Sequence, residues 1–493
     1  MLSCEGSLLS IDLGTSAVKA LVFDLQGNVL AQAQAGYQMS FPRPNWVEQD
    51  PQEWWAAVCK ALHELKRAVP LDSVKAVGLS GQMKGLVLLS HDHVPVRPCI
   101  VYTDSRSANE AACLKEHHGT EIFQRTGGWV RTPATVTKLM WVKQYEPSVW
   151  ESAETFVLPK DYVRLRLTGV ACTEPTDAAG TLLFDIHTGS WMYDLAEQLG
   201  LTDLTLPPIA HSHVPVGYIT PLAAQETGIP VGIPVVGGAS DMACTVLGGG
   251  LMAEGDTSIT LSTAAQVLTA IEQPMHAKFQ GTSYNLHAQA GLGFLMGSIY
   301  AGGYSYKWIR DLLKLQAVTH AELEEQVKQV KPGCDGLLYL PHILGAGTPT
   351  FDPAFRGAFL EVSAYHTPFH FVRAAMEGVA FQIRECVELV ENAGVSITTC
   401  LIGAGGSRNS LWRQIIADVL NRPLRVPSCL DLSGMGAAIL AGVGAEIYPD
   451  LQAGFSAMVQ ITGVVEPQES NRAAYNDQYE RFRDYTCRLL PSK

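Results

Sequence analysis

The sequence has few charged residues and lacks the patterns of a disulfide-stabilised or membrane-spanning protein. Charged residues make up 17% of the 493 residues, below the usual quarter, which favours a large core. The eleven cysteines are scattered singly, without a Cys-x-x-Cys pair. This predicts reduced thiols in a cytoplasmic protein, with Cys244 and Cys386 as small core residues. No basic-then-apolar signal segment opens the chain, and the uncharged stretch at 291–306 is too rich in glycine and serine for a membrane helix.

The charge balance and the length narrow the class of protein further. A net charge of −13 argues against nucleic acid or an anionic membrane as a partner, so we predict neither. One core rarely grows beyond ~250–300 residues, so the length predicts two or more domains.

The segment 9–24 predicts a strand, a tight polar turn and a second strand. Asp12 ends the first strand, and Gly14, two hydroxyl side chains and Lys19 follow it. Such a turn offers N–H groups, hydroxyls and an ammonium to a phosphate, and a carboxylate to its magnesium ion. Taken alone, it is equally typical of an ordinary hairpin.

A similar strand–turn–strand segment at 256–264 opens the second half of the chain. Each half then alternates strands with amphipathic helices, for example at 50–68 and 411–420. Alternating elements predict an α/β fold with largely buried sheets. We expect two domains, 1–248 and 249–493, with a ligand cleft between them.

Seven blocks stand in a recognisable order: the Asp12 turn, WVEQDP at 46–51, GQMKG at 81–85, LPKDY at 158–162, GGASD at 237–241, the segment 357–377 and GAGGS at 403–407. On these blocks the chain resembles the FGGY carbohydrate kinases, most closely the xylulokinase branch, over about residues 10–445. The resemblance implies an actin-like ATPase (ribonuclease H-like) fold, in which two α/β domains surround a catalytic cleft. It also implies a small sugar as substrate, ATP and Mg²⁺ as cofactors, and homodimers as a family-level expectation.

The resemblance implies a role for individual residues as well. Asp241, after a strand and two glycines, matches the general base that takes the proton from the sugar hydroxyl. A helix N-cap is the alternative role for this Asp, and both roles can hold together. Asp12 matches the magnesium-holding group. The predicted sugar contacts are Gln82, Met83, Lys84, Asp104, Asp241 and Met242, and the predicted ATP contacts are Thr15, Ser16, Lys19, Thr263, Gly303, Gly405 and Asn409.

The chain departs from the family pattern around the substrate. Lys84 stands where xylulokinases usually carry His, and Met242 replaces a polar residue. The turn at 262–265 reads Ser-Thr-Ala-Ala where Gly-Thr-Ser-Gly is more usual. A buried ammonium needs partners, so Lys84 is expected to bond sugar hydroxyls, to pair with a carboxylate such as Asp104, or to bind an anionic substrate group. The alternative is that it extends to solvent.

The predicted function is ATP-dependent phosphorylation of a small sugar, with D-xylulose to D-xylulose 5-phosphate as the best match. Two alternatives stay open. One is a kinase of another ketose, a polyol or an aldonate, as Lys84 indicates. The other is a catalytically impaired sugar-binding or regulatory protein on the same fold.

Overall fold

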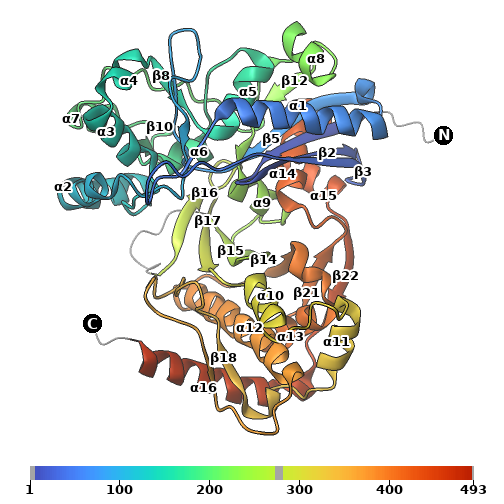
Figure 1. The fold of residues 1–493 in the computed structure, drawn as a ribbon. Coiled ribbons are helices and arrows are strands. Elements are labelled where there is room, and N and C mark those ends of the chain that lie inside the picture. Colours follow the sequence, from blue (N-terminus) through green and yellow to red (C-terminus); the bar gives the residue numbers. More distant parts are fainter. Residues whose placement is uncertain (1–5, 273–280, 491–493) are drawn as a thin grey trace. The chain divides into compact units, whose positions relative to one another are not determined.

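The computed structural model describes residues 6–272 and 281–490, and the chain forms two compact units (Figure 1). The first unit comprises Met1–Gly248, Tyr284–Gly293 and Asp431–Gln460. The second comprises Gly249–Ser283, Phe294–Leu430 and Ile461–Lys493. Both units are therefore discontinuous in sequence, and the division into domains 1–248 and 249–493 stays a prediction.

The first unit is built on a mixed sheet in the strand order β11-β12-β5-β1-β2-β3, with β13 also paired to β5. β1 is buried along its whole length, whereas burial alternates along the outer strand β3, as expected where one face meets solvent. The predicted strand–turn–strand at 9–24 is confirmed by β1 and β2, which pair antiparallel. The strands are β1 (Ser7–Leu13), β2 (Ala17–Asp24), β3 (Val29–Gly36), β5 (Val74–Gly81), β11 (Pro215–Tyr218), β12 (Pro234–Val236) and β13 (Ala239–Ser240).

Helices and short strand pairs complete the first unit. The predicted helix at 50–68 is confirmed as α1, where Asp50 caps the N-terminus by accepting from the backbone N–H of Gln52 at 2.8 Å. The short pairs are β4 (Glu48–Gln49) with β7 (Cys99–Ile100), β6 (Val87–Leu89) with β8 (Thr155–Val157), and β9 (Phe184–Asp185) with β10 (Ser190–Trp191). The helices are α1 (Pro51–Ala68), α2 (Ala108–Thr126), α3 (Thr135–Tyr145), α4 (Pro147–Ser152), α5 (Pro159–Thr168), α6 (Pro175–Gly180), α7 (Tyr193–Gln198), α8 (Pro221–Thr227), α9 (Asp241–Gly248), α14 (Leu432–Gly444), α15 (Leu451–Met458) and the 3₁₀ turn η1 (Leu71–Ser73).

Helix α14 packs directly on the sheet of the first unit, although it comes late in the chain. A Cβ atom on Gly78 of β5 would lie 1.9 Å from the carbonyl oxygen of Ala437, so the helix and the strand meet backbone to backbone. This contact brings the first turn of α14 to the end of β1.

The second unit repeats the pattern with strands in the order β17-β15-β14-β20-β21-β22. The predicted strand–turn–strand at 256–264 is confirmed by β14 and β15, and the helix at 411–420 by α13. The strands are β14 (Asp256–Leu261), β15 (Ala265–Ile271), β17 (Gly293–Ile299), β18 (Leu338–Leu340), β19 (Ala358–Leu360), β20 (Thr399–Gly403), β21 (Leu424–Pro427) and β22 (Ile461–Val465). The remaining strand, β16 (Ser283–Leu286), lies almost wholly in the segment Tyr284–Gly293, which belongs to the first unit. The helices are α10 (Gly303–Leu312), α11 (His320–Lys328), α12 (Pro368–Asn392), α13 (Ser410–Leu420), α16 (Arg472–Leu489) and the 3₁₀ turns η2 (Cys334–Gly336), η3 (Gly405–Arg408) and η4 (Glu469–Asn471).

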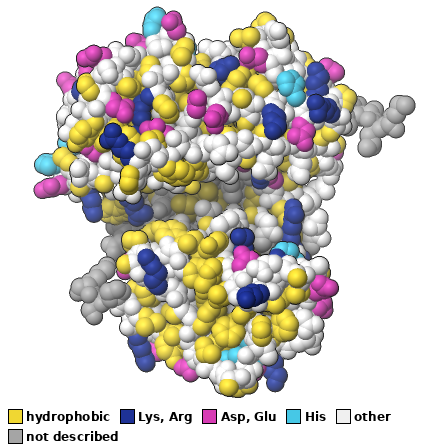
Figure 2. Space-filling view, in the orientation of Figure 1, with side chains coloured by type: hydrophobic (Ala, Val, Ile, Leu, Met, Phe, Trp, Pro, Cys, Tyr) yellow, Lys and Arg dark blue, Asp and Glu magenta, His cyan; other side chains and the backbone are white. Residues whose placement is uncertain are grey.

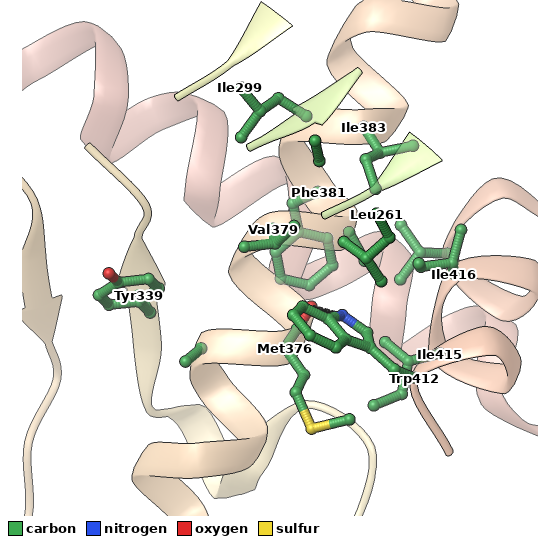
Figure 3. Close-up of a cluster of buried hydrophobic side chains, with 14 of the residues drawn as sticks. Leu261, Ile299, Tyr339, Met376, Val379, Phe381, Ile383, Trp412, Ile415 and Ile416 are labelled. Atoms are coloured by element: carbon green, nitrogen blue, oxygen red, sulfur yellow. Dashed lines mark hydrogen bonds between the residues drawn. The ribbon is translucent and has the colours of Figure 1, made fainter. Parts of the chain in front are cut away.

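The core of the second unit lies between its sheet and α12 and α13. Figure 3 shows Trp412 of α13 beside Met376 of α12, to whose carbonyl oxygen the indole N–H donates at 3.0 Å. Burying an indole is favourable when its N–H keeps a partner. The two predicted core cysteines, Cys244 and Cys386, are confirmed as buried.

The surface carries charges of both signs. On the face drawn in Figure 2, Lys and Arg side chains are interspersed with Asp and Glu side chains over both units. Within residues 6–272 and 281–490, no helix combines the length and the apolar character needed to cross a membrane.

Candidate functional site

Three parallel strands of the first unit end at the same edge of its sheet. Asp12 of β1 lies opposite Ser80 of β5, and Ser240 of β13 lies opposite Gly81. The backbone N–H of Gln82 donates to the carbonyl oxygen of Leu13 at 2.8 Å. The topology therefore gathers Asp12, Gln82 and Asp241, and the carboxyl ends of strands in α/β sheets are where ligands usually bind.

Asp12 is buried at this edge, and its two carboxylate oxygens differ in their hydrogen bonding. Its Oδ2 accepts from the Ser433 hydroxyl at 2.7 Å, whereas Oδ1 is buried and forms no hydrogen bond with the described residues. Burial, together with the charge of Asp431, raises the pKa of Asp12, and the hydroxyls of Ser433 and Ser80 and the charge of Lys19 oppose that shift. An unpartnered buried carboxylate oxygen is a group that a hard cation would satisfy.

Two residues around Asp12 were missed by the sequence reasoning. Asp431 caps α14 and forms an ion pair with Lys19 at 3.0 Å. Ser433 lies in the first turn of the same helix, 421 residues along the chain from the Asp12 that it bonds. The Asp-Leu-Ser start of a helix was readable as an N-cap. Its place beside β1 was not, because it depends on the packing of α14.

The residues around Asp12 fit a magnesium ion held partly by other ligands. The described residues contain no group of three or more His, Cys, Asp or Glu side chains arranged for a metal. Mg²⁺ commonly takes only one or two protein carboxylates and keeps water and phosphate oxygens as its other ligands. The free Oδ1 of Asp12 is consistent with that mode.

Side chains of neighbouring residues donate hydrogen bonds to the backbone of the turn after Asp12. The Gln49 side chain donates to the carbonyl oxygen of Thr15 at 2.7 Å, and the Tyr37 hydroxyl donates to that of Gly14. The hydroxyls of Thr15 and Ser16 form no hydrogen bond with described residues. The turn thus keeps these two hydroxyls available, as a phosphate-binding turn requires.

Asp241 is the first residue of α9, and the helix does not use it as the N-cap. The Ser240 hydroxyl accepts from the N–H of Ala243 at 3.3 Å, so Ser240 takes the capping role. The Asp241 carboxylate accepts instead from the N–H of the adjacent Met242 at 2.7 Å. Loss of solvation and then the charge of Asp12 raise the pKa of Asp241 to about 7, against the lowering effects of the Met242 N–H and Lys84.

The two glycines before this helix start allow its close approach to the sheet. Gly238 has φ +73, and a Cβ there would lie 2.5 Å from the carbonyl oxygen of Leu79. A Cβ on Gly237 would lie 2.7 Å from that of His211. A larger residue at Gly238 would therefore push the segment, and Asp241 with it, away from β5, and one at Gly237 would collide with the backbone at His211.

Gln82 links the predicted sugar contacts to the phosphate turn. Its side-chain nitrogen donates to Gln49 Oε1 at 2.9 Å, and the other end of Gln49 holds Thr15. The Oε1 atom of Gln82 is buried and has no hydrogen-bond partner among the residues that the structure describes. This oxygen is a ready acceptor for a ligand hydroxyl.

Lys84 has an unusual backbone conformation and a buried ammonium. Its φ of 65° is held by Thr135 and Lys138, whose side chains donate to the Lys84 carbonyl oxygen at 3.2 and 2.8 Å. The residue as a whole is half-buried, and its ammonium is desolvated and forms no ion pair within the described residues. Burial and the Arg131 charge lower the pKa of Lys84, while Asp241 opposes the shift. Met83 and Lys84 both lie against Gly180.

Asp104 is buried and saturated by protein donors. Arg106 donates to both of its oxygens at 2.8 to 3.0 Å, and the N–H of Val47 donates at 2.6 Å. The expected pairing of Lys84 with Asp104 is therefore not formed. A sugar contact at Asp104 stays a prediction. The hydrogen bonds that Asp104 accepts favour a role in positioning Arg106.

Of the predicted ATP contacts, Thr15, Ser16 and Lys19 lie in the first unit. The other four, which are Thr263, Gly303, Gly405 and Asn409, lie in the second unit, in or beside the turns that follow β14 and β20. The turn after β14 is tied to α10, because the N–H of Gly303 donates to the carbonyl oxygen of Ser262 at 2.7 Å and that of Tyr304 to Thr263 at 3.0 Å. A Cβ on Gly303 would lie 2.4 Å from the Ser262 oxygen, so only glycine fits there. Thr263 is exposed.

The glycine-rich turn after β20 lies beside that of β14, since the two strands pair in parallel. Gly405 is exposed, and a Cβ there would meet no atom within 4 Å, so packing does not explain this glycine. Asn409 caps α13 by accepting from the N–H of Trp412 at 2.9 Å, which leaves its side-chain nitrogen for a ligand. Ala404 has φ 68° and ψ 177°, a region normally restricted to glycine.

Comparisons with known proteins match both halves of the chain to one family. The N-terminal domain model of the FGGY family of carbohydrate kinases matches residues 7–248, and the C-terminal domain model matches residues 257–445. A xylulose kinase of Bacillus subtilis is 33% identical over 97% of this chain and 96% of its own length. A xylulose kinase of Escherichia coli is 30% identical over 98% and 99%. A solved xylulose kinase structure from Rhodospirillum rubrum is 28% identical, with a TM-score of 0.88 over 98% of this chain and 99% of that one.

Proposed function

The chain belongs to the FGGY family of carbohydrate kinases, and from this premise we propose that it phosphorylates D-xylulose with ATP to give D-xylulose 5-phosphate. The sequence identity of 30–33% to xylulose kinases along nearly the whole chain supports D-xylulose as the substrate. The single observation that carries the chemistry is Asp241, a carboxyl group at the sheet edge with a pKa raised to about 7.

In the proposed mechanism, Asp241 accepts the proton of the sugar hydroxyl as the hydroxyl oxygen attacks the γ-phosphorus of ATP. The bond to the β,γ-bridging oxygen breaks and ADP leaves. A base with a pKa near the working pH is well matched to this task and contributes about 10²–10⁴-fold. Gln82 Oε1 orients the sugar by accepting from another hydroxyl.

Asp12 is the residue proposed to hold Mg²⁺, through its unpartnered Oδ1 atom. When bound, the ion neutralises charge on the phosphates. Thr15, Ser16 and Lys19 are proposed to contact phosphate in the first unit. In the second unit, Thr263, Gly303, Gly405 and Asn409 are proposed to contact the nucleotide.

One observation favours a second candidate, a kinase of an acidic sugar such as an aldonate. The Lys84 ammonium is buried and forms no ion pair among the described residues. A substrate carboxylate would give this cation the partner that burial requires.

An ADP-release assay across D-xylulose, other ketoses, polyols and aldonates tests both candidates. We expect D-xylulose to show the highest kcat/KM. An aldonate in first place would establish the second candidate, and no turnover with any sugar would favour a binding or regulatory protein. Lys84→His, with the exposed Lys60→His as control, should change the ranking if Lys84 contacts the sugar, whereas the KM for ATP should stay nearly constant.

A further inference from the structure

We propose that Thr176 is a positioning residue that fixes the backbone of the segment 237–241, and with it Asp241, to a buried cluster of charged side chains. The proposal rests on the role proposed above for Asp241. The cluster, called here the buried charged cluster, consists of Lys160, Asp161, Arg164, Glu174 and Asp177.

The buried charged cluster is closed to solvent. All five side chains have an exposed fraction of 0%. The Lys160 ammonium lies 2.6 Å from Asp161 Oδ1, 2.9 Å from Asp177 Oδ2 and 3.3 Å from Glu174 Oε1. Buried ion pairs often stabilise a fold no more than apolar residues of the same volume would. Their stability alone therefore gives little reason for so many charges in one place.

Two contacts connect the buried charged cluster to the backbone before Asp241. Arg164 Nη1 lies 2.9 Å from Asp161 Oδ1 and also donates to the carbonyl oxygen of Gly237. The Thr176 hydroxyl donates to Glu174 Oε1 at 2.8 Å and accepts from the N–H of Ser240 at 2.9 Å. Thr176 thus joins the cluster to the residue immediately before the proposed base.

The cluster also lies directly against the end of β5, the strand after which the predicted sugar contacts Gln82, Met83 and Lys84 follow. A Cβ on Gly81, at the end of β5, would lie 2.7 Å from Cβ of Lys160. The same few side chains therefore support both the end of β5 and the start of α9. This gives a physical role to the block at 158–162, which supplies Lys160 and Asp161 and which no catalytic assignment uses.

Loss of the Thr176 hydroxyl would leave the buried Ser240 N–H without its acceptor. The segment would then move to find another partner, and Asp241 would move with it. A misplacement of about 1 Å in a catalytic group costs on the order of 10²-fold in rate. The effect should appear in kcat rather than in nucleotide binding.

The test compares Thr176→Val, which keeps the side-chain shape, with Thr176→Ser, which keeps the hydroxyl. Thr227→Val is the matched control, because Thr227 is also fully buried and its hydroxyl also accepts a backbone N–H, that of Ile229 at 3.3 Å. We expect Thr176→Val to lower kcat roughly 10- to 100-fold with an unchanged KM for ATP. Thr176→Ser should restore kcat, and Thr227→Val should keep it while losing a similar amount of thermal stability.

Three results would overturn the proposal: a folded Thr176→Val variant with wild-type kcat, a serine variant as slow as the valine variant, or an equal kcat loss in Thr227→Val. If Thr176→Val does not fold, Thr176→Cys replaces it, since a thiol is a weaker acceptor of similar size; a wild-type kcat in that variant would overturn the proposal equally. Asp241→Asn separates the two proposals. If it loses turnover while Thr176→Val keeps it, only the positioning role fails; if it keeps turnover, the base assignment fails and the positioning role with it.

Discussion

In the first unit, the parallel strands β1, β5 and β13 end at residues that carry or adjoin carboxyl or ammonium groups, whereas in the second unit β14 and β20 lead into turns that begin with hydroxyl, alanine and glycine residues. Both sheets share the same local topology, in which an antiparallel hairpin has a parallel strand beside its first strand. Asp12, Lys84 and Asp241 lie at the first edge. Thr263, Gly405 and Asn409 lie at the second.

This difference separates chemistry from recognition. Titratable groups with shifted pKa values, such as Asp12 and Asp241, are expected where protons and metal ions are handled. An edge of exposed glycine and hydroxyl groups is suited to contact a nucleotide through backbone and short side chains. Changes at the first edge should therefore alter rate and pH dependence, and changes at the second should alter stability or nucleotide binding.

The largest expected effect is at Asp241. Asp241→Asn keeps the shape but removes the proton acceptor, so kcat should fall about 10²–10⁴-fold. Binding of ATP and sugar, measured by calorimetry, should persist. The exposed Asp72→Asn is the control and should behave as wild type. A turnover within a few-fold of wild type in Asp241→Asn would contradict the assignment.

The next effect is at Asp12 and concerns magnesium. Asp12→Asn replaces a charged ligand oxygen by a neutral amide and should raise the magnesium concentration for half-maximal rate at least ~10-fold, the lower range for damage to a metal site. The measurement is a magnesium titration of kcat at saturating ATP. An unchanged titration would show that Asp12 does not hold the ion.

The pH dependence of kcat/KM tests the ionisable groups of the first edge while Asp241 stays in place. Asp241 acts deprotonated, so kcat/KM should rise with pH through about 7 and level off above it. Lys84 lowers the pKa of Asp241, so Lys84→Met should move this rise to higher pH, whereas the exposed Lys60→Met should not. A rise centred near pH 4 in the wild type would mean that the base keeps an ordinary carboxyl pKa.

The smallest effect is expected in the second unit, where the backbone is strained at Ala404. Its φ of 68° and ψ of 177° carry a strain of about 1–3 kcal/mol, which glycine would not have. Glycine also raises the conformational entropy of the unfolded chain, and this lowers the free energy of unfolding by about 0.4–1 kcal/mol. Ala404→Gly should thus raise the midpoint of thermal unfolding. Ala393→Gly, at an unstrained φ of −79°, should not. A lower midpoint for Ala404→Gly would show that the turn is not strained.

Local pattern was enough to predict much of the fold. The hairpin at 9–24, the Asp-Pro start of α1 and the helix α13 follow from alternation, capping residues and helical periodicity, all of which act within a few residues. The order of the blocks predicted the family, which the comparisons confirmed. The pattern did not predict the return of 431–460 to the first unit, because nothing local marks which sheet a helix covers.

The candidate site could also be predicted only in part from local pattern. The residue types of Asp12, Asp241 and Lys84 were readable in the chain, and so was the departure at Lys84. Their surroundings were not readable. Ser433 donates a hydrogen bond to Asp12 from 421 residues further along the chain, and Arg106 forms an ion pair with Asp104. The Thr176 hydroxyl accepts from the N–H of Ser240 and so connects it to the buried charged cluster. The sequence by itself determined which chemical groups are present and which short elements carry them. Tertiary structure alone decided which of those groups keep a free atom for a ligand, because burial, pKa and hydrogen-bond saturation depend on neighbours that are distant in the chain.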